Sequence, residues 1–546
     1  MTGAVATGTS TISATLDDAV ARRGDAPWMV IGQETQTFTE LGQRVDAIAA
    51  GLIAAGVEPG DGIALFLGNR FEWLQIEYAA AAIGAFLVPL NTWLRQRELT
   101  HILASSGCRV LLWGDRILRH DLRPLLQQLV PELTQPQTSV ASARFPALKT
   151  VVGLGEGPWP AGVLGWEELL RRGEAVPASV RRERAAAVRP EDTGLVLYTS
   201  GTTGQPKGAV LSQTGIVDHM RSWTTHLGLG PDDRSIMASP LFWVFGCTLN
   251  AMVPLHAGSM TVLHERFDAE RFLGDLSGHA CTHLQGVPDQ YELMLGHERS
   301  ADHDLSAIRV VQLGGSRSVG SLARRLLERA PDAQMVGAYG LTEAVGVNTW
   351  TEFDDPIERL ATTIGHPAPD NEVVLRDPGT LEPVEPGQVG EIWIRGGHVA
   401  RGYLGDEEAT AAAFVDGFLR TGDLASADED GYLTLSGRLS HTYKRGGMNV
   451  YPAEIEALLA EHPAVQFPAV VGVPDERLGE VGAAFVVLAP GQEVGEAELL
   501  AWCEGQLADY KLPRYVRFVE ELPMTASGKV RKHVLQEGWA DGQPVA

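Results

Sequence analysis

The stretch LYTSGTTGQPKGAVL, residues 197–211, is dominated by glycine, serine and threonine and contains one lysine, Lys207. Glycine adopts backbone angles that other residues avoid, so such a loop can turn successive N–H groups toward an anion. Hydroxyl groups and the lysine ammonium group add donors that suit a phosphate. Lys207 lies between Pro206 and Gly208, so it cannot open a helix as the Walker A lysine does. The apolar run at 195–197 predicts a buried strand leading into a different phosphate loop.

Length and composition limit the class of protein. A chain of 546 residues is too long for one hydrophobic core, and it predicts several subdomains. Hydrophobic residues make up 44% and charged residues 21%, as in ordinary globular proteins. The net charge of −25 argues against nonspecific binding of nucleic acid or anionic membranes. The most apolar segment, residues 79–90, is shorter than a membrane span, so no stable membrane insertion is expected.

Cysteine usage points to a reducing compartment. The four cysteines are far apart in the sequence and form no C-x-x-C pair, which argues against a disulfide framework. The first 16 residues lack a basic segment followed by an apolar run, so we expect no signal peptide. These features predict a cytoplasmic protein.

Helical and strand patterns alternate along residues 38–113 and again along 195–345. This alternation predicts an α/β fold with a largely parallel sheet. Residues 131–190 carry scattered prolines and an arginine-rich segment, and we expect a variable, solvated connection there.

The pattern changes after about residue 365. Short strand-like pieces separated by Gly, Pro and Asp turns predict a small antiparallel, barrel-like β-subdomain. After residue 450 helix and strand patterns mix again, which predicts a small α+β unit. The boundary is expected near 437–447, giving a large domain at 1–439 and a small mobile domain at 440–546.

Four further motifs follow the loop in order. They are YGLTE at 339–343, TGD at 421–423, GRLSHTYKRGGMNVYPAEIE at 437–456 and PMTASGKVRK at 523–532. Together with the loop, they resemble the acyl-CoA synthetase and adenylate-forming superfamily, over about residues 15–535. The resemblance implies that ATP and Mg²⁺ convert a carboxylic acid to an acyl-adenylate, which a thiol, usually that of coenzyme A, then attacks. Because two anions must meet in the first step, cations and oriented donors are required.

The resemblance also implies roles for individual residues in nucleotide binding. It assigns the pyrophosphate-gripping loop to Thr199, Ser200, Gly201, Thr202, Thr203, Gly204 and Lys207. Glu343 matches the Mg²⁺ ligand, and Thr342 matches a contact to the α-phosphate. Adenine binding is assigned to Gly315, Ser316, Arg317 and Tyr339. Asp423 matches the ribose clamp, with Arg438 as its partner.

In the second domain, Lys529 matches the catalytic lysine that bridges the carboxylate and the α-phosphate. The resemblance implies that this domain then rotates as a lid and that Gly446 and Gly447 come to line a tunnel for the pantetheine arm. Lys444 either contacts phosphates of the coenzyme or faces solvent.

The chain departs from the family pattern at three positions. Gln213 and Trp243 stand where histidine is common, and His441 occupies the hinge position, which is usually Asp or Lys. Trp243 is expected either to shape the acyl pocket or to pack in the core. The pKa of an ordinary histidine lies near neutrality. We therefore consider the hypothesis that His441 makes the domain rotation pH-sensitive or alters the second half-reaction. The alternative is that histidine is simply tolerated at this position.

The acyl pocket is expected to contain no cationic side chain. Its candidate residues are Phe242, Trp243, Val287, Val345 and Val347. An apolar lining favours a fatty, alicyclic or aromatic acid.

Three functions remain open from the sequence. The first is an ATP-dependent acyl-CoA ligase. The second is an adenylate-forming enzyme with another acceptor or acid, such as a carrier-protein phosphopantetheine arm, or nitrite activated for transfer to an amine. The third, a non-catalytic nucleotide-binding protein, is disfavoured because Lys529, Glu343, Asp423 and Arg438 are all present. No nucleic-acid partner is expected, and a homodimer stays open.

Overall fold

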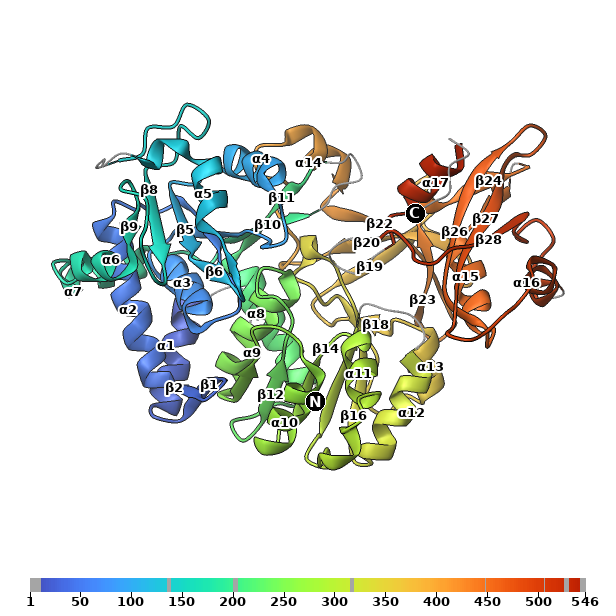
Figure 1. The fold of residues 1–546 in the computed structure, drawn as a ribbon, viewed down its shortest axis with the longest axis horizontal. Coiled ribbons are helices and arrows are strands. Elements are labelled where there is room, and N and C mark those ends of the chain that lie inside the picture. The colour runs from blue at the N-terminus through green and yellow to red at the C-terminus, as the bar shows by residue number, and fades with distance from the viewer. Residues whose placement is uncertain are drawn as a thin grey trace. The chain divides into compact units, whose positions relative to one another are not determined.

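The computed structural model describes residues 11–134, 139–199, 205–314, 319–446, 448–504, 506–524 and 530–540 (Figure 1). The chain divides into two compact units. The first consists of Met1–Leu360, Gly365–Glu372 and Ile394–Leu419, and the second of Ala361–Ile364, Val373–Trp393 and Arg420–Ala546. The expected domain boundary between residues 439 and 440 stays a prediction.

A seven-stranded sheet in the first unit carries the predicted phosphate loop. All its neighbouring strands run parallel except β10 and β11, which form an antiparallel hairpin. In spatial order, the strands are β11 (Lys207–Ser212), β10 (Thr193–Thr199), β4 (Phe86–Pro89), β3 (Gly62–Phe66), β5 (Val110–Gly114), β8 (Thr150–Leu154) and β9 (Leu164–Gly165). The loop motif therefore joins two strands at one edge of this sheet.

A nine-stranded sheet forms the second half of the first unit. Its central strands run parallel, and antiparallel strands complete both edges. In spatial order, the strands are β18 (His366–Pro367), β17 (Thr349–Trp350), β16 (Gln334–Tyr339), β15 (Val310–Gly314), β14 (His283–Gly286), β12 (Arg234–Met237), β13 (Met260–Leu263), β1 (Pro27–Ile31) and β2 (Glu34–Thr37).

Alternating side chains divide these sheets between separate cores. In β3, Ile63 and Leu65 join the largest apolar cluster, whereas Ala64 and Phe66 join another. Successive side chains of a strand point to opposite faces, so each sheet is covered on both sides. The helices that contribute to the largest cluster include α1 (Ile12–Arg23), α2 (Phe38–Ala54), α3 (Phe71–Ala82), α6 (Trp166–Gly173), α8 (Gln213–His226) and α9 (Asn250–Ala257). The outer faces are covered by α4 (Gln96–Ser106), α5 (Arg123–Leu129), α10 (Ala269–Gly278), α11 (Pro288–Leu295) and α12 (Val319–Arg329).

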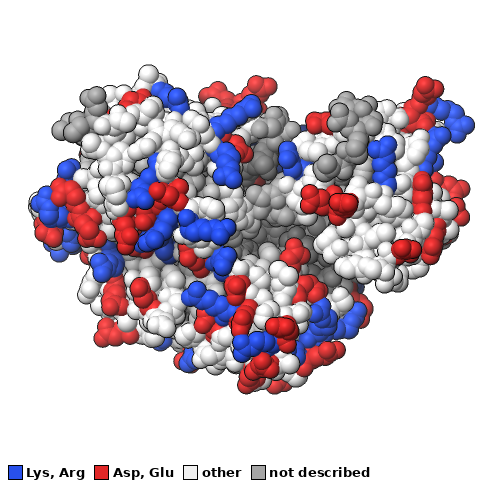
Figure 2. Space-filling view, in the orientation of Figure 1, with Lys and Arg blue, Asp and Glu red and all other residues white. Residues whose placement is uncertain are grey.

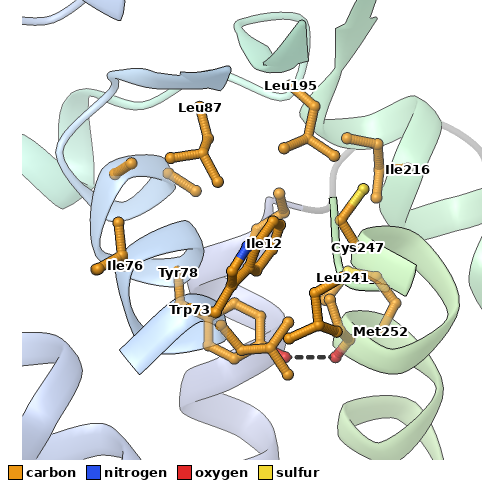
Figure 3. Packing of buried hydrophobic residues seen from close by; sticks show 14 of the residues in the cluster. Ile12, Trp73, Ile76, Tyr78, Leu87, Leu195, Ile216, Leu241, Cys247 and Met252 are labelled. Atoms are coloured by element: carbon orange, nitrogen blue, oxygen red, sulfur yellow. Dashed lines mark hydrogen bonds between the residues drawn. The ribbon is translucent and has the colours of Figure 1, made fainter. Parts of the chain in front are cut away.

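The largest cluster fixes α3 against the segment that contains α9. Trp73 and Tyr78 of α3 face Leu241 and Met252 (Figure 3). The Tyr78 hydroxyl donates to the Ala251 carbonyl over 2.6 Å, which satisfies this buried group. This packing supports the segment that follows Leu241, where the acyl pocket is expected.

The second unit contains most of a small antiparallel sheet and a separate α+β body. The strands of the small sheet are β19 (Glu372–Arg376), β20 (Val389–Arg395), β21 (Phe414–Val415), β22 (Phe418–Ala427) and β23 (Leu433–Arg438). The α+β body has strands β24 (Tyr443–Arg445), β25 (Met448–Val450), β26 (Val465–Asp475), β27 (Gly479–Leu488) and β28 (Tyr515–Phe518), with helices α15 (Pro452–Ala460), α16 (Glu496–Cys503) and α17 (Lys532–Ala540). Two apolar clusters lie on the two sides of β26 and β27.

The predicted α/β class and the small α+β body are confirmed. The interpretation of 131–190 as a solvated connection was wrong for part of its length. Strands β8 and β9 belong to the first sheet, and α6 (Trp166–Gly173) packs Leu169 against the core. Helix α7 (Ala178–Ala187), which buries no residue, fits the prediction.

Candidate active site

The hairpin β10–β11 places Thr199 and Lys207 opposite each other, where the strands meet the predicted loop. Lys207 Nζ lies 5.5 Å from the centroid of the Tyr403 ring, at cation–π distance. Five predicted loop residues lie outside the described residues, namely Ser200, Gly201, Thr202, Thr203 and Gly204. The ends of the loop thus present a hydroxyl group and an ammonium group close to one aromatic ring.

Glu343 lies in the short helix η4 (Thr342–Ala344), beside Thr199 and Tyr403. The Tyr403 hydroxyl donates to Glu343 Oε1 over 3.0 Å, and the Thr199 hydroxyl donates to the same oxygen over 3.3 Å. Across the described ranges, no hydrogen bond reaches the second carboxylate oxygen, Oε2. The backbone of Glu343 is also fixed, because Ala400 N donates to its carbonyl over 2.7 Å. Among the described residues, the carboxylate is therefore oriented through one of its oxygens.

Tyr403 was not among the predicted site residues. Its backbone extends the hairpin, because Val210 N donates to the Gly402 carbonyl over 3.0 Å and Leu404 N donates to the Gly208 carbonyl over 2.8 Å. Burial and then the neighbouring Glu343 raise the pKa of Tyr403, so the hydroxyl keeps its proton as a donor. In the sequence, the one signal for Tyr403 was the neighbouring glycines in RGYLG, which indicate that another backbone segment can approach closely.

Tyr339 and Thr342 flank the same turn. Tyr339 ends β16 and pairs with Thr349 of β17, and both Tyr339 and Thr342 are half-buried. Gly315, Ser316 and Arg317, which were predicted to lie beside adenine, are outside the described residues.

An aromatic group surrounds Trp243. The rings of Trp93 and Trp243 make an edge contact with centroids 5.2 Å apart, and Phe242 lies 5.5 Å from Trp93 and 5.8 Å from Trp243. Trp93 is 43% exposed, which is unusual for so large an apolar side chain. No motif or periodic pattern pairs Trp93 with Trp243, which is 150 positions later in the chain. The two expected pocket residues and Trp93 thus form one aromatic surface.

The π-helical turn η2 (Phe245–Leu249) follows this surface directly. The Thr248 hydroxyl lies 2.5 Å from the Val244 carbonyl and 3.5 Å from the Val345 carbonyl. Val345 and Val347 are buried beside it. π-Helical turns occur mostly as single-turn features at functional sites. The structure therefore brings Val345 close to the segment that carries Trp243.

The backbone of Val287 caps a helix, and its place in the acyl pocket stays a prediction. It precedes α11, and its amide donates to Gln290 Oε1 over 3.3 Å. Gln213 is also structural. Its Nε2 donates to the Ala81 carbonyl over 3.1 Å, and its Oε1 accepts from Ile12 N over 3.1 Å, which ties α8 to α1 and α3.

In the second unit, Asp423 and Arg438 meet across strands β22 and β23. Arg438 Nε donates to Asp423 Oδ1 over 2.7 Å. The aspartate side chain is 8% exposed and the arginine side chain 46% exposed. This geometry aligns a nearly buried carboxylate with a half-exposed cation, and the role of the pair in ribose binding stays a prediction.

His441 corrects one sequence-based hypothesis. Burial, followed by the nearby Lys532 and Arg438, lowers the pKa of His441 to about 4. The expectation of a pKa near neutrality is therefore wrong, because two cations and desolvation oppose protonation.

The remaining predicted residues of the second unit lie at its surface or outside the described ranges. Lys444 is exposed, and its backbone amide donates to Glu480 Oε2 over 3.1 Å. Gly446 adopts φ +58°, a left-handed conformation that suits glycine. Gly447 and Lys529 are outside the described residues.

Charge is mixed over the visible surface. Figure 2 shows Lys and Arg interspersed with Asp and Glu on the described parts of each unit. All four cysteines are buried as free thiols. In the described part of the chain, no helix is both long and apolar enough to cross a membrane.

Comparison with known proteins decides the family. The sequence model of the AMP-binding enzyme family matches residues 16–404, and that of the AMP-binding enzyme C-terminal domain matches 454–529. The chain belongs to the AMP-binding enzyme family. It is an AMP-forming acyl-CoA ligase, which activates a carboxylic acid with ATP and transfers the acyl group to coenzyme A.

Relatives match nearly the whole chain. The chain is 36% identical to the putative acyl-CoA synthetase YngI of Bacillus subtilis, over 92% of this chain and 91% of that protein. It is 37% identical to a 7a-methyl-1,5-dioxo-octahydro-1H-inden-4-yl propanoyl:CoA ligase of Mycobacterium tuberculosis, over 96% and 98% of the two chains. A solved structure of the anthranilate CoA ligase AuaEII in complex with anthranoyl-AMP is 27% identical, with a TM-score of 0.85 and 98% of each chain covered.

Proposed function

We propose that this ligase acts on an acid with a ring or a medium-length chain, and that Glu343 holds the Mg²⁺ of Mg·ATP. The observation that carries the metal assignment is the one-sided bonding of the Glu343 carboxylate. Tyr403 and Thr199 both donate to Oε1, and neither donates to Oε2. One carboxylate oxygen with phosphate oxygens and waters is the usual environment of Mg²⁺ in nucleotide sites. When bound, the ion would neutralise phosphate charge.

The chain's own residues would supply the remaining electrostatics of adenylation. Lys207 and the loop before it would bind the β- and γ-phosphates, and Thr342 would donate to the α-phosphate. Asp423 would accept hydrogen bonds from the ribose hydroxyls, with Arg438 holding it in place. Lys529 would bridge the incoming carboxylate and the α-phosphate, so that repulsion between two anions no longer opposes attack.

The acid class follows from the aromatic surface. Trp93, Phe242 and Trp243 present three rings, and Val345 and Val347 add buried aliphatic groups. Such a wall favours flat or alicyclic rings and aliphatic chains, because it offers no charge to pair with a second ionised group. Relatives named for an indenyl propanoyl acid, a medium-chain acyl group and a feruloyl group agree with this class.

Coenzyme A is the proposed acceptor. Gly446 and Gly447 would line the path of the pantetheine arm, where a chain without side chains leaves room for a thin substrate. Buried free cysteines fit the reducing cytoplasm that this proposal assumes. A homodimer stays a prediction.

Mass spectrometry tests both the acid and the acceptor. The protein is incubated with ATP, Mg²⁺ and octanoate, cyclohexanepropanoate, ferulate, malonate or nitrite, with and without coenzyme A. A thioester and AMP are expected for the first three acids, only when coenzyme A is present. AMP or trapped adenylate without thioester would contradict the proposed acceptor and indicate a carrier protein or an amine. A thioester from malonate alone would contradict the acid class.

A further inference from the structure

A second group of polar side chains, the buried His219 and His398 and the 28%-exposed Asp370, lies next to the turn that follows Glu343. His219 of α8, whose side chain is 0% exposed, contacts Asp370 and the backbone of Val347. His219 Nδ1 donates to Asp370 Oδ2 over 2.7 Å, and Nε2 donates to the Val347 carbonyl. Both ring nitrogens of His219 are therefore held by oxygen atoms, one from a carboxylate and one from the backbone.

A second histidine completes the group. His398 stacks on His219, with ring centroids 3.9 Å apart and planes 11° apart. Burial and then the neighbouring His219 lower the pKa of His398 well below its usual value, so His398 is neutral. Asn348 Nδ2 lies 3.2 Å from His398 Nε2, which accepts from it. His219 is therefore packed between the His398 ring and the Asp370 carboxylate.

The geometry argues against a metal centre, although ligand atoms of His219, Asp370 and His398 lie within 4.8 Å of one another. Imidazole binds a metal through a lone pair in the plane of the ring. The stacked rings of His219 and His398 are nearly parallel, so the lone pairs of their nitrogens lie in two separate planes. The two rings therefore cannot both direct a lone pair at one ion. Both nitrogens of His219 are also used as donors.

The Val347 carbonyl belongs to a strained turn. Val345 has φ +58° and Gly346 has φ +93°. A left-handed conformation is costly for a β-branched residue such as valine, and it persists only where the surroundings hold it. Gly346 N donates to the Leu341 carbonyl over 3.0 Å, and Asn348 N donates to the Tyr339 carbonyl over 2.6 Å. The bond from His219 adds a side-chain contact to these backbone bonds.

We propose that the His219–Asp370 pair is a positioning device that fixes the turn at 345–347 and thereby sets the shape of the acyl pocket. The turn connects Glu343 to Val345 and Val347, so its conformation affects the acid more directly than the nucleotide. The pocket assignment rests on the proposed function, whereas the effect on the backbone does not. His219 and Asp370 act through the Val347 carbonyl and touch neither substrate nor phosphate.

Hydrogen–deuterium exchange tests the backbone effect without any substrate. His219→Phe keeps a flat ring for stacking on His398 but removes both donors, and Asp370→Asn removes the charge that pairs with His219. In both variants, amide exchange in peptides covering 341–349 is expected to rise about tenfold or more, as loss of a charge-assisted hydrogen bond predicts. His226→Phe is the matched control, because His226 lies on the same helix and bonds to another backbone carbonyl, that of Thr351, over 3.2 Å. It should leave this segment unchanged.

Acid selectivity tests the functional effect. The ratio of kcat/KM for octanoate over ferulate is expected to change about tenfold in His219→Phe and Asp370→Asn, with an unchanged Kd for ATP. The double variant should change no more than either single variant, because both act through one contact. Unchanged exchange at 341–349 in both variants would overturn the proposal, as would stoichiometric zinc in the wild type that His219→Phe removes. If no acid supports turnover by the wild type, the proposed function is wrong. The hydrogen–deuterium exchange at 341–349 still tests whether His219 and Asp370 fix the turn.

Discussion

Tyr403 donates its hydroxyl hydrogen to Glu343 Oε1 over 3.0 Å, across 60 positions of sequence. Thr199 supplies the second hydrogen bond to that oxygen, so the carboxylate is bound by two elements of the first unit. A ligand for Mg²⁺ needs a fixed orientation, because second-shell hydrogen bonds set the direction of the ligating oxygen. Tyr403 thus has a role that no motif had suggested.

Replacing Tyr403 with phenylalanine removes this hydrogen bond and keeps the ring near Lys207. We expect kcat/KM for Mg·ATP to fall about 10- to 100-fold, as for loss of a hydrogen bond to a charged group. Binding of Mn²⁺ with ATP, followed by electron paramagnetic resonance, should weaken as well. Tyr198→Phe is the control, because among the described residues its hydroxyl bonds to Ser105, over 2.8 Å, and not to Glu343. An equal loss of kcat/KM in Tyr403→Phe and Tyr198→Phe would contradict a specific role for the Tyr403 hydroxyl.

Asp423→Asn tests the ribose clamp. The change removes the negative charge that Arg438 bonds to over 2.7 Å, and it weakens the acceptor offered to the ribose. We expect the KM for ATP to rise about tenfold or more, with little change in the KM for the acid. Glu429→Gln, an exposed change on the following turn, should alter neither constant. A larger effect on the acid than on ATP would place Asp423 elsewhere in the mechanism.

Trp243→Ala tests the acyl wall. Removing the indole opens space beside Trp93 and Phe242, so acids bulkier than octanoate should gain in relative kcat/KM, by about tenfold. Thermal unfolding must also be measured, because Trp243 is partly buried and its loss destabilises the fold. A lower melting temperature with unchanged acid selectivity would show that Trp243 only packs the core.

His441→Asn tests the corrected hinge hypothesis. The folded protein holds the pKa of His441 at about 4, whereas an unfolded histidine titrates near 6.5. Between these values the unfolded chain binds a proton at this position that the folded chain does not bind. The contribution of His441 to stability therefore decreases as pH falls from about 6.5 to about 4.

The expected result is a smaller loss of Tm for His441→Asn than for the wild type between pH 7.5 and pH 5. Between pH 6.5 and pH 8, both half-reactions should keep the same pH profile in the two proteins. A wild-type inflection near pH 6.5 in thioester formation, absent from the variant, would restore the pH-sensitive hinge.

Much of the fold could be predicted because it depends on local patterns. The apolar run at 195–197 forms buried strand β10, and the helical spacing after Phe38 forms α2. The pairing of Asp423 with Arg438 could be predicted because both residues lie in motifs that occur in a fixed order along the chain. Strand β8 was missed because TVVGL is short and lies among prolines, and only the neighbouring strand β5 shows that it belongs to the sheet.

The missed site residues depend on contacts between distant segments. Trp93 meets Trp243 150 positions later, and His219 meets Asp370 151 positions later. Neither pair of residues is marked by a periodic pattern or by a motif, so a single sequence cannot reveal these contacts. The low pKa of His441 likewise depends on Lys532, which only the folded second unit brings close.

Acid-dependent exchange of labelled pyrophosphate into ATP tests the central claim most directly, because it requires reversible formation of an acyl-adenylate. The wild type is predicted to exchange label with octanoate or ferulate and not without acid. Glu343→Gln, which keeps acceptors for Tyr403 and Thr199 but removes the charge for Mg²⁺, is predicted to lose exchange by about 100-fold or more while still binding ATP. Exchange that needs no acid, or that survives intact in Glu343→Gln, would contradict this account.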